Sequence, residues 1–146
     1  MLLLDANILI SAFRPDAPTH ARTRSWLAEL DGSRETFLVP DVVFSALIRI
    51  TTNPASYRGF GNPSLMRDAL AFCTQMRAFT GFQTFLPGSA HWNLFTTFCS
   101  IPGVAGNHVT DAYLAAAAVD QGAELITADR GFIRYPGLRF RNPLDG

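Results

Sequence analysis

Lysine is absent from this 146-residue chain. All twelve basic residues are arginine, and twelve acidic residues balance them, so the formal net charge is zero. A neutral chain cannot bind nucleic acid through bulk positive charge, and any such contact has to come from a local patch. The lack of lysine also argues against a phosphate-cradling loop at Gly103 and Gly106, because no lysine follows these glycines and no strand precedes them.

Cysteine and long apolar runs are scarce as well. The two cysteines, Cys73 and Cys99, show no metal-type spacing and no nucleophile signature, and we interpret them as reduced thiols of a cytosolic protein. No uncharged run is long enough to cross a bilayer, and the first residues lack the basic and apolar regions of a signal peptide. We therefore expect a cytoplasmic protein without membrane contact.

The chain instead contains apolar residues in alternating strand-like and helix-like patterns. Hydrophobic residues make up 48% and charged residues 16%, which fits a single packed domain over residues 1–146. Helical patterns separate the short apolar runs that predict strands, namely 2–4, 37–39, 82–86, 123–127 and 138–140. Strands that alternate with helices form parallel sheets covered on both faces. The predicted fold is α/β, with a central, mostly parallel sheet of four to five strands flanked by helices.

Four aspartates are expected at one edge of this sheet. Asp5 and Asp41 follow the first two predicted strands, and Asp129 follows the fourth. Asp111 opens an alanine-rich helix, and helix N-termini in such folds point to the edge where the strands end. Asp120 lies roughly 13 Å farther along that helix and is expected at the opposite edge.

Asp5 is the most informative of these acids. It ends a run of apolar residues, where a carboxylate is costly to bury without a partner. Because lysine is absent, a metal cation is the simplest partner, and clustered carboxylates suit Mg²⁺ or Mn²⁺. One or two such ions could activate water for phosphodiester cleavage. For Asp41 alone, capping of the helix that it opens is a sufficient explanation. Asn7 and Thr110 are the predicted caps of two other helices.

Short motifs in this order and spacing resemble those of a known family. Segments 4–7 (LDAN), 110–112 (TDA) and 125–130 (LITADR) look like the acidic motifs of PIN-domain nucleases. Segments 49–54 (RITTNP) and 132–138 (FIRYPGL) are similar to the VapC-type toxins of bacterial type II toxin–antitoxin pairs. The likeness runs from residue 1 to about residue 144.

The resemblance implies a PIN domain with a metal-dependent endoribonuclease activity that cuts structured cellular RNA such as transfer or ribosomal RNA. Asp5, Asp111 and Asp129 match acidic positions of the family and would bind Mg²⁺. Asn7 matches the polar residue that orients the first acid, and Thr110 matches the hydroxyl beside Asp111. The resemblance also implies a homodimer, and a cognate antitoxin whose tail lies in a groove and obstructs the acidic site.

Two positions depart from the family pattern. Many relatives have a glutamate where this chain has Ala46, and a further acid where it has Gly131. Asp41 could reach in to complete the set, although five residues from position 46 it faces roughly 140° away on the helix. The missing acids motivate an alternative, a PIN-like module that binds RNA or antitoxin without cleavage. A small-molecule phosphohydrolase of another α/β family is a third, poorer interpretation.

Two groups of charged residues remain to be placed. Four arginines crowd the C-terminal region and could hold RNA phosphates near the acids, or could equally form a solvated face; they are Arg130, Arg134, Arg139 and Arg141. Among the histidines, only His108 lies near a predicted site residue.

Overall fold

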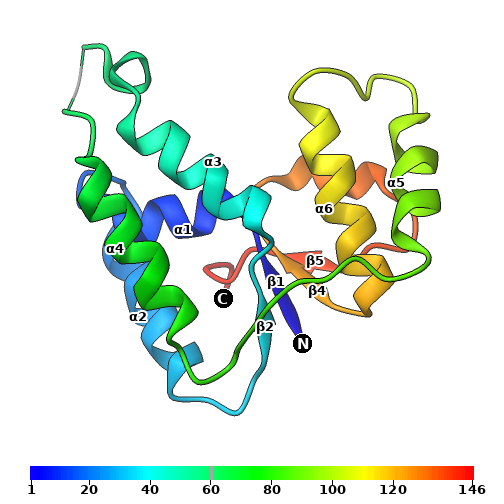
Figure 1. Ribbon diagram of the computed structural model, residues 1–146, viewed down its shortest axis with the longest axis horizontal. Coiled ribbons are helices and arrows are strands. Elements are labelled where there is room, and N and C mark those ends of the chain that lie inside the picture. The colour runs from blue at the N-terminus through cyan, green and yellow to red at the C-terminus, as the bar shows by residue number, and fades with distance from the viewer. Residues whose placement is uncertain (60) are drawn as a thin grey trace.

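A five-stranded parallel sheet lies at the centre of the computed structural model, which describes residues 1–59 and 61–146 (Figure 1). Its strands are β1 (Leu2–Leu4), β2 (Phe37–Leu38), β3 (Phe82–Gln83), β4 (Glu124–Ile126) and β5 (Phe140–Arg141). Their order is β3-β2-β1-β4-β5, and each neighbouring pair is parallel. The predicted α/β fold with four to five mostly parallel strands is confirmed.

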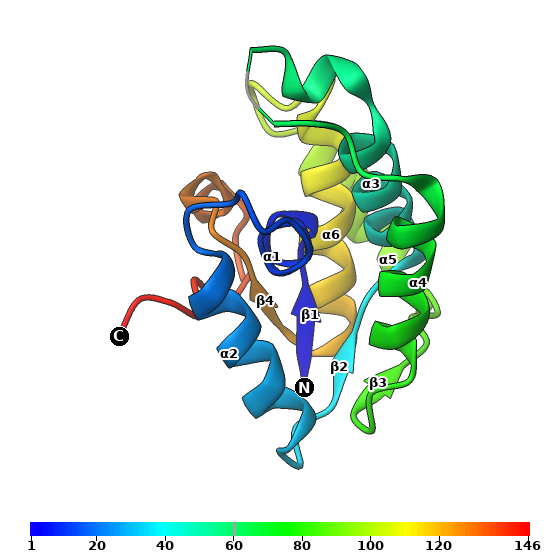
Figure 2. The ribbon, with the colours of Figure 1, turned by 90° about the vertical axis from the view of Figure 1, so that its left-hand side faces the viewer.

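Helices cover both faces of this sheet (Figures 1 and 2). The α-helices of the described residues are α1 (Ala6–Phe13), α2 (His20–Asp31), α3 (Asp41–Thr52), α4 (Met66–Arg77), α5 (His91–Cys99) and α6 (His108–Gln121). Two 3-10 helices follow α3 and β4, namely η1 (Pro54–Tyr57) and η2 (Arg130–Arg134). In the figures α1 and α2 lie on one face, and α5 and α6 pack as a pair on the other.

The core forms where the apolar runs predicted it. Leu3 and Leu4 of β1 are fully buried, as are Leu125 and Ile126 of β4. Helix α6 presents the run 115–118, four alanines that are also fully buried. Such small side chains let the helix backbone approach the sheet closely, and this fixes where the first turn of α6 lies relative to the strand ends.

The helix starts differ from the predicted caps. Asp5 caps α1, because its backbone is extended and its Oδ1 accepts a 2.7 Å hydrogen bond from the Ala6 amide; Asn7 lies inside the helix. Helix α6 begins at His108, so Thr110 is within its first turn and caps nothing. Residue type shows which side chains are able to accept a hydrogen bond from a helix N-terminus. It does not show at which residue the backbone turns into the helix.

The two cysteines are free thiols, with Cys73 buried and Cys99 partly buried. No helix within residues 1–59 and 61–146 is both long and apolar enough to span a bilayer.

The edge strand β3 depends on a glycine. The Gly81 carbonyl accepts a 2.9 Å hydrogen bond from the Phe37 amide, and a Cβ atom at position 81 would collide with the backbone carbonyl of Glu35. We expect Gly81→Ala to lower the free energy of unfolding by about 1–3 kcal/mol, because β2 and β3 must separate to admit the methyl group. Urea denaturation measures this change.

Gly32→Ala is the matched control. Position 32 has an ordinary negative φ, and its nearest obstacle is the Ala28 carbonyl oxygen at 3.6 Å. This substitution should leave stability unchanged or raise it by about 0.4–1 kcal/mol, since it restricts the unfolded chain. Equal losses in the two variants would contradict the argument for Gly81.

Candidate functional site: an acidic edge at the ends of β1 and β4

Strands β1 and β4 end side by side, and this brings two segments far apart in the sequence together. Leu4 is in register with Ile126, and the Asp5 amide donates a 3.0 Å hydrogen bond to the Ile126 carbonyl. The residues that follow these strands, Asp5 and Thr127, are therefore neighbours. This edge lies at the carboxyl ends of parallel strands, where open α/β sheets bind their ligands.

The Asp5 carboxylate is held by three donors. Oδ1 accepts from the Ala6 amide, and Oδ2 accepts from the Thr127 hydroxyl at 2.7 Å and the Asn7 Nδ2 at 3.0 Å. Asn7 Oδ1 in turn accepts from the Ala128 amide at 3.1 Å. Asn7 thus bonds to the Asp5 carboxylate on one side and to the segment after β4 on the other.

Asp129 is positioned through the same network. Its amide donates to the Thr127 hydroxyl oxygen at 3.0 Å, and its Oδ1 accepts a 2.7 Å hydrogen bond from the amide of Gly131, in the first turn of η2. The carboxylate therefore caps a 3-10 helix while Asp129 remains exposed at the sheet edge.

Asp111 approaches this edge from the first turn of α6. Its carboxylate is half-buried, and its Oδ2 lies 3.4 Å from His108 Nδ1. His108 is the histidine that the sequence placed near the site.

The three carboxylates act on one another electrostatically. Burial raises the pKa of Asp5 to about 6; hydrogen bonds from Thr127 and Ala6 oppose the rise, and the charges of Asp111 and Asp129 add to it. Burial also raises the pKa of Asp111; the His108 hydrogen bond opposes this rise, and the charge of Asp129 adds to it. Asp5 is only 8% exposed, and no described ion pair includes it. A cation at this edge would relieve both the burial cost and the mutual repulsion.

The donor set fits a hard divalent cation. Carboxylate oxygens are the ligands that Mg²⁺ and Mn²⁺ prefer. Among the described residues, no three His, Cys, Asp or Glu side chains are arranged so that they alone could hold an ion. Mg²⁺ does not require such a cage, because it keeps several waters and attaches to one or two carboxylates.

Two predicted residues lie differently. Asp41 has a highly exposed side chain whose Oδ1 is 3.7 Å from Arg77 Nη1 on α4, and its charge is not among those that act on Asp5. Thr110 is exposed in the first turn of α6, beside Asp111, and its hydroxyl forms no hydrogen bond with the described residues. Asp120 accepts a hydrogen bond from the Gly88 amide, outside the acidic edge.

Thr127 is the site residue to which the sequence analysis gave no role. It is 1% exposed, and its hydroxyl links Asp5, Asn7 and the Asp129 amide. The available signal was a hydroxyl at the end of an apolar run, the position that made Asp5 conspicuous.

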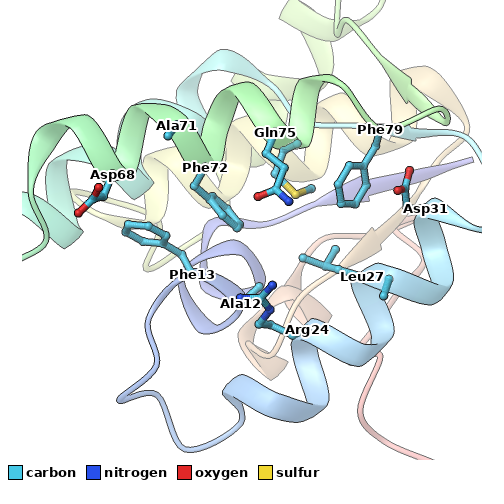
Figure 3. A pocket seen from close by; sticks show the side chains of 12 residues that line it. Ala12, Phe13, Arg24, Leu27, Asp31, Asp68, Ala71, Phe72, Gln75 and Phe79 are labelled. Atoms are coloured by element: carbon cyan, nitrogen blue, oxygen red, sulfur yellow. The ribbon is translucent and has the colours of Figure 1, made fainter.

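A groove between α1, α2 and α4 is the second feature that could bind a ligand (Figure 3). It encloses about 490 Å³. Its apolar lining includes Phe13, Leu27, Phe72, Met76 and Phe79, and its charged residues are Arg24, Asp31 and Asp68. Figure 3 shows Phe13 of α1 and Phe72 of α4 side by side toward one end of the groove. Their ring centroids are 5.1 Å apart.

The chain is similar to known proteins in sequence and in fold. The family model described as the PIN domain matches residues 2–138. Ribonuclease VapC43 of Mycobacterium tuberculosis is 38% identical over 146 residues, which cover 100% of this chain and 97% of the relative. Among solved structures, M. tuberculosis VapC20, a Sarcin-Ricin loop cleaving toxin, superposes with a TM-score of 0.67 at 10% identity, covering 91% of this chain and 93% of that one. DNA-bound VapBC from Salmonella typhimurium gives 0.65 at 21% identity, covering 98% and 99%.

The hydroxyl of Thr127 should make a measurable contribution to the free energy of unfolding. Thr127→Val removes a donor to the Asp5 carboxylate and an acceptor for two N–H groups, and we expect it to lower the free energy of unfolding by about 1–3 kcal/mol. Thr127→Ser keeps the hydroxyl and should cost less than about 1 kcal/mol, the value of one buried methyl group. Equal stabilities of the two variants in urea denaturation would show that the network contributes nothing.

Proposed function

Because this chain belongs to the PIN domain family, and within it to the VapC ribonucleases, we propose that it is a metal-dependent endoribonuclease and the toxin of a toxin–antitoxin pair. Its substrate is structured cellular RNA, such as transfer or ribosomal RNA, in which it hydrolyses phosphodiester bonds. The observation that carries the proposal is the buried Asp5 carboxylate, which shares one sheet edge with Asp111 and Asp129 and has no cationic partner among the described residues.

In this proposal each residue of the acidic edge has a distinct task. Asp5, Asp111 and Asp129 would provide the oxygen ligands of Mg²⁺, one or two of them directly and the rest through water, and Mn²⁺ could substitute. The ion, when bound, supplies an activated water and stabilises the charge on the cleaved phosphate. Asn7 and Thr127 hold the Asp5 carboxylate in one orientation through their hydrogen bonds to Oδ2. The exposed hydroxyl of Thr110 lies where an RNA backbone approaching Asp111 would pass.

The alternative is a PIN-like module that binds RNA or antitoxin without cleaving. Ala46 and Gly131 stand where many relatives have acids, so this chain has fewer carboxylates to hold an ion. Three carboxylates at one edge still exceed the one or two that Mg²⁺ requires, and for that reason we favour the nuclease. Family membership also argues against a small-molecule phosphohydrolase of another α/β family.

An RNA-cleavage assay tests this proposal. Purified protein, freed of any antitoxin, is incubated with total RNA in Mg²⁺ or Mn²⁺ and separately with chelator. We expect discrete fragments that require the metal, and a loss of at least about 100-fold in rate for Asp111→Asn, because removing one charged ligand weakens both the ion and its effect on the phosphate.

Asp120→Asn is the matched control for this assay. It changes the same residue type in the same helix at the other end, and the asparagine oxygen can still accept from the Gly88 amide. Its rate should stay within about twofold of the wild type, since surface changes away from a site are near neutral. Metal-saturated, folded protein that cuts neither transfer nor ribosomal RNA would favour the binding module instead. Fragments that persist with chelator and in Asp111→Asn would reveal a contaminant.

We further propose that the groove between α1, α2 and α4 receives a segment of the cognate antitoxin. The groove offers an apolar floor with both signs of charge at its rim, which suits an amphipathic peptide. Helix α1 connects the two features, since Asp5 caps its start and its last residue, Phe13, lines the groove. A segment that continues past this helix could therefore reach the acidic edge.

A charge placed in the groove separates toxicity from neutralisation. Ala71 lines the groove on α4, and Ala71→Glu should keep growth arrest on expression while weakening rescue by co-expressed cognate antitoxin, because it buries an unpaired charge under the peptide. Thr74→Glu adds the same charge to the same helix outside the lining and should be rescued like the wild type. Rescue of both variants would place the antitoxin elsewhere.

A cytoplasmic homodimer completes the proposal. Leu86 and Trp92, near and on α5, are 73% and 67% exposed, which is unusual for large apolar side chains and suits a protein interface.

A further inference from the structure

The C-terminal arginines, treated as one group in the sequence, have separate partners in the structure. Three of them have partners other than Asp5, Asp111 and Asp129: Arg130 lies 3.9 Å from Asp145, Arg139 donates to the Gly122 carbonyl at 3.1 Å, and Arg141 lies 3.3 Å from Glu124. Arg134, at the end of η2, is different. Its charge acts on the carboxyl group of Asp111, and it has no ion-pair partner within 4 Å among the described residues.

Arg134 is anchored at one nitrogen only. Its Nε donates a 3.0 Å hydrogen bond to the Gly131 carbonyl, and its side chain is partly buried. This hydrogen bond fixes the plane of the guanidinium group and leaves its Nη nitrogens available to a further acceptor.

The lack of a side chain at Gly131 creates the space beside this group. A Cβ atom at position 131 would stand 3.0 Å from Asp129 Oδ1 and 3.4 Å from Arg134 Nη2, so both groups border the same small volume. The guanidinium group is therefore next to a carboxylate of the acidic edge without forming an ion pair with it.

From this geometry we infer that Arg134 binds the phosphate that is cleaved. The inference rests on the proposed ribonuclease function. A phosphate held by a cation at the acidic edge would bring its free oxygens to the border that Asp129 and Arg134 share. A guanidinium group matches two phosphate oxygens with two parallel N–H donors.

The contribution of Arg134 is electrostatic. It donates hydrogen bonds to oxygens on which negative charge grows as the phosphate reacts, and no bond to the arginine forms or breaks. Because Nε is already fixed, little side-chain entropy is lost when the phosphate arrives. This chain has no lysine and no net charge, and one well-positioned arginine is enough to give it a local site for an anion.

A matched pair of variants tests the inference. Arg134→Met and Arg130→Met each remove one positive charge from η2, but Arg130 is exposed and directed toward Asp145. In RNA cleavage with Mg²⁺, we expect Arg134→Met to lower kcat by about 100-fold or more and to raise KM by at most about tenfold, because a preorganised donor acts more strongly on the reacting phosphate than on the bound one. Arg130→Met should change kcat by less than about threefold. Arg134→Lys, which keeps the charge without the fork, should fall between them.

Chemical rescue separates contact with the phosphate from support of η2. Arg134→Ala protein is assayed with guanidinium chloride at low, non-denaturing concentration, and with equal sodium chloride. We expect guanidinium alone to restore kcat at least about tenfold, because the ion can occupy the vacated volume beside Asp129 and reproduce the fork. A residue that only held the Gly131 carbonyl would lower thermal stability without this rescue, and that result would overturn the inference.

An RNA-binding measurement under conditions without cleavage tests the Arg134 contact independently of the proposed nuclease activity. A fluorescein-labelled single-stranded RNA of mixed sequence is titrated in chelator, and its anisotropy is followed. Arg134→Met should bind about tenfold more weakly than Arg130→Met, the value of one charge-assisted hydrogen bond. If the wild type binds in this Arg134-dependent way but never cleaves, the nuclease proposal fails and the phosphate contact stands. If it cleaves, and the two methionine variants match in binding and in kcat, the contact at Arg134 is wrong.

Discussion

The buried carboxylate of Asp5 is the constraint on which this molecule depends. It ends β1, caps α1 through the Ala6 amide, and accepts the Thr127 hydroxyl from the end of β4. One side chain thus fixes the helix start and the junction of the two central strands. The arrangement is costly, because burial raises the pKa of Asp5 to about 6, and the charges of two other acids add to the rise. A structural role alone would not require three acids at this edge, and their mutual repulsion supports the proposal that a cation binds there.

The packing of α6 places the third acid. The four buried alanines at 115–118 allow the helix to lie close against the sheet, so its first turn, with Asp111, comes level with the ends of the strands. Bulkier residues would move the helix outward and separate Asp111 from Asp5. Helix α1 contacts both proposed surfaces: Asp5 caps its start at the acidic edge, and Phe13 at its end lines the groove. The two surfaces proposed for RNA and for antitoxin are therefore connected by one short, partly buried helix.

Sequence patterns predicted the features that depend on residue type and order. Apolar runs gave the parallel sheet, and the rule for strand ends brought Asp5, Asp111 and Asp129 to one edge. Features that depend on side-chain direction could not be predicted in this way. Asp41 also follows a strand, yet it is exposed and turned toward Arg77. The bonding of Thr127 requires knowing that β4 lies next to β1, which is a property of the sheet order and not of the local sequence.

The number of arginines in the chain does not show which of them can bind an anion. Five of the twelve lie within ion-pair distance of the chain's own acids, namely Arg14, Arg67, Arg77, Arg130 and Arg141. Such pairs are largely surface features that contribute little to stability, and they neutralise charge that could otherwise attract RNA. What distinguishes Arg134 is therefore position: a fixed Nε, the space left by Gly131 and a carboxylate nearby that it does not engage. Recognition of an anion by a neutral chain depends on such unpaired groups, because the field of the whole molecule supplies no general attraction.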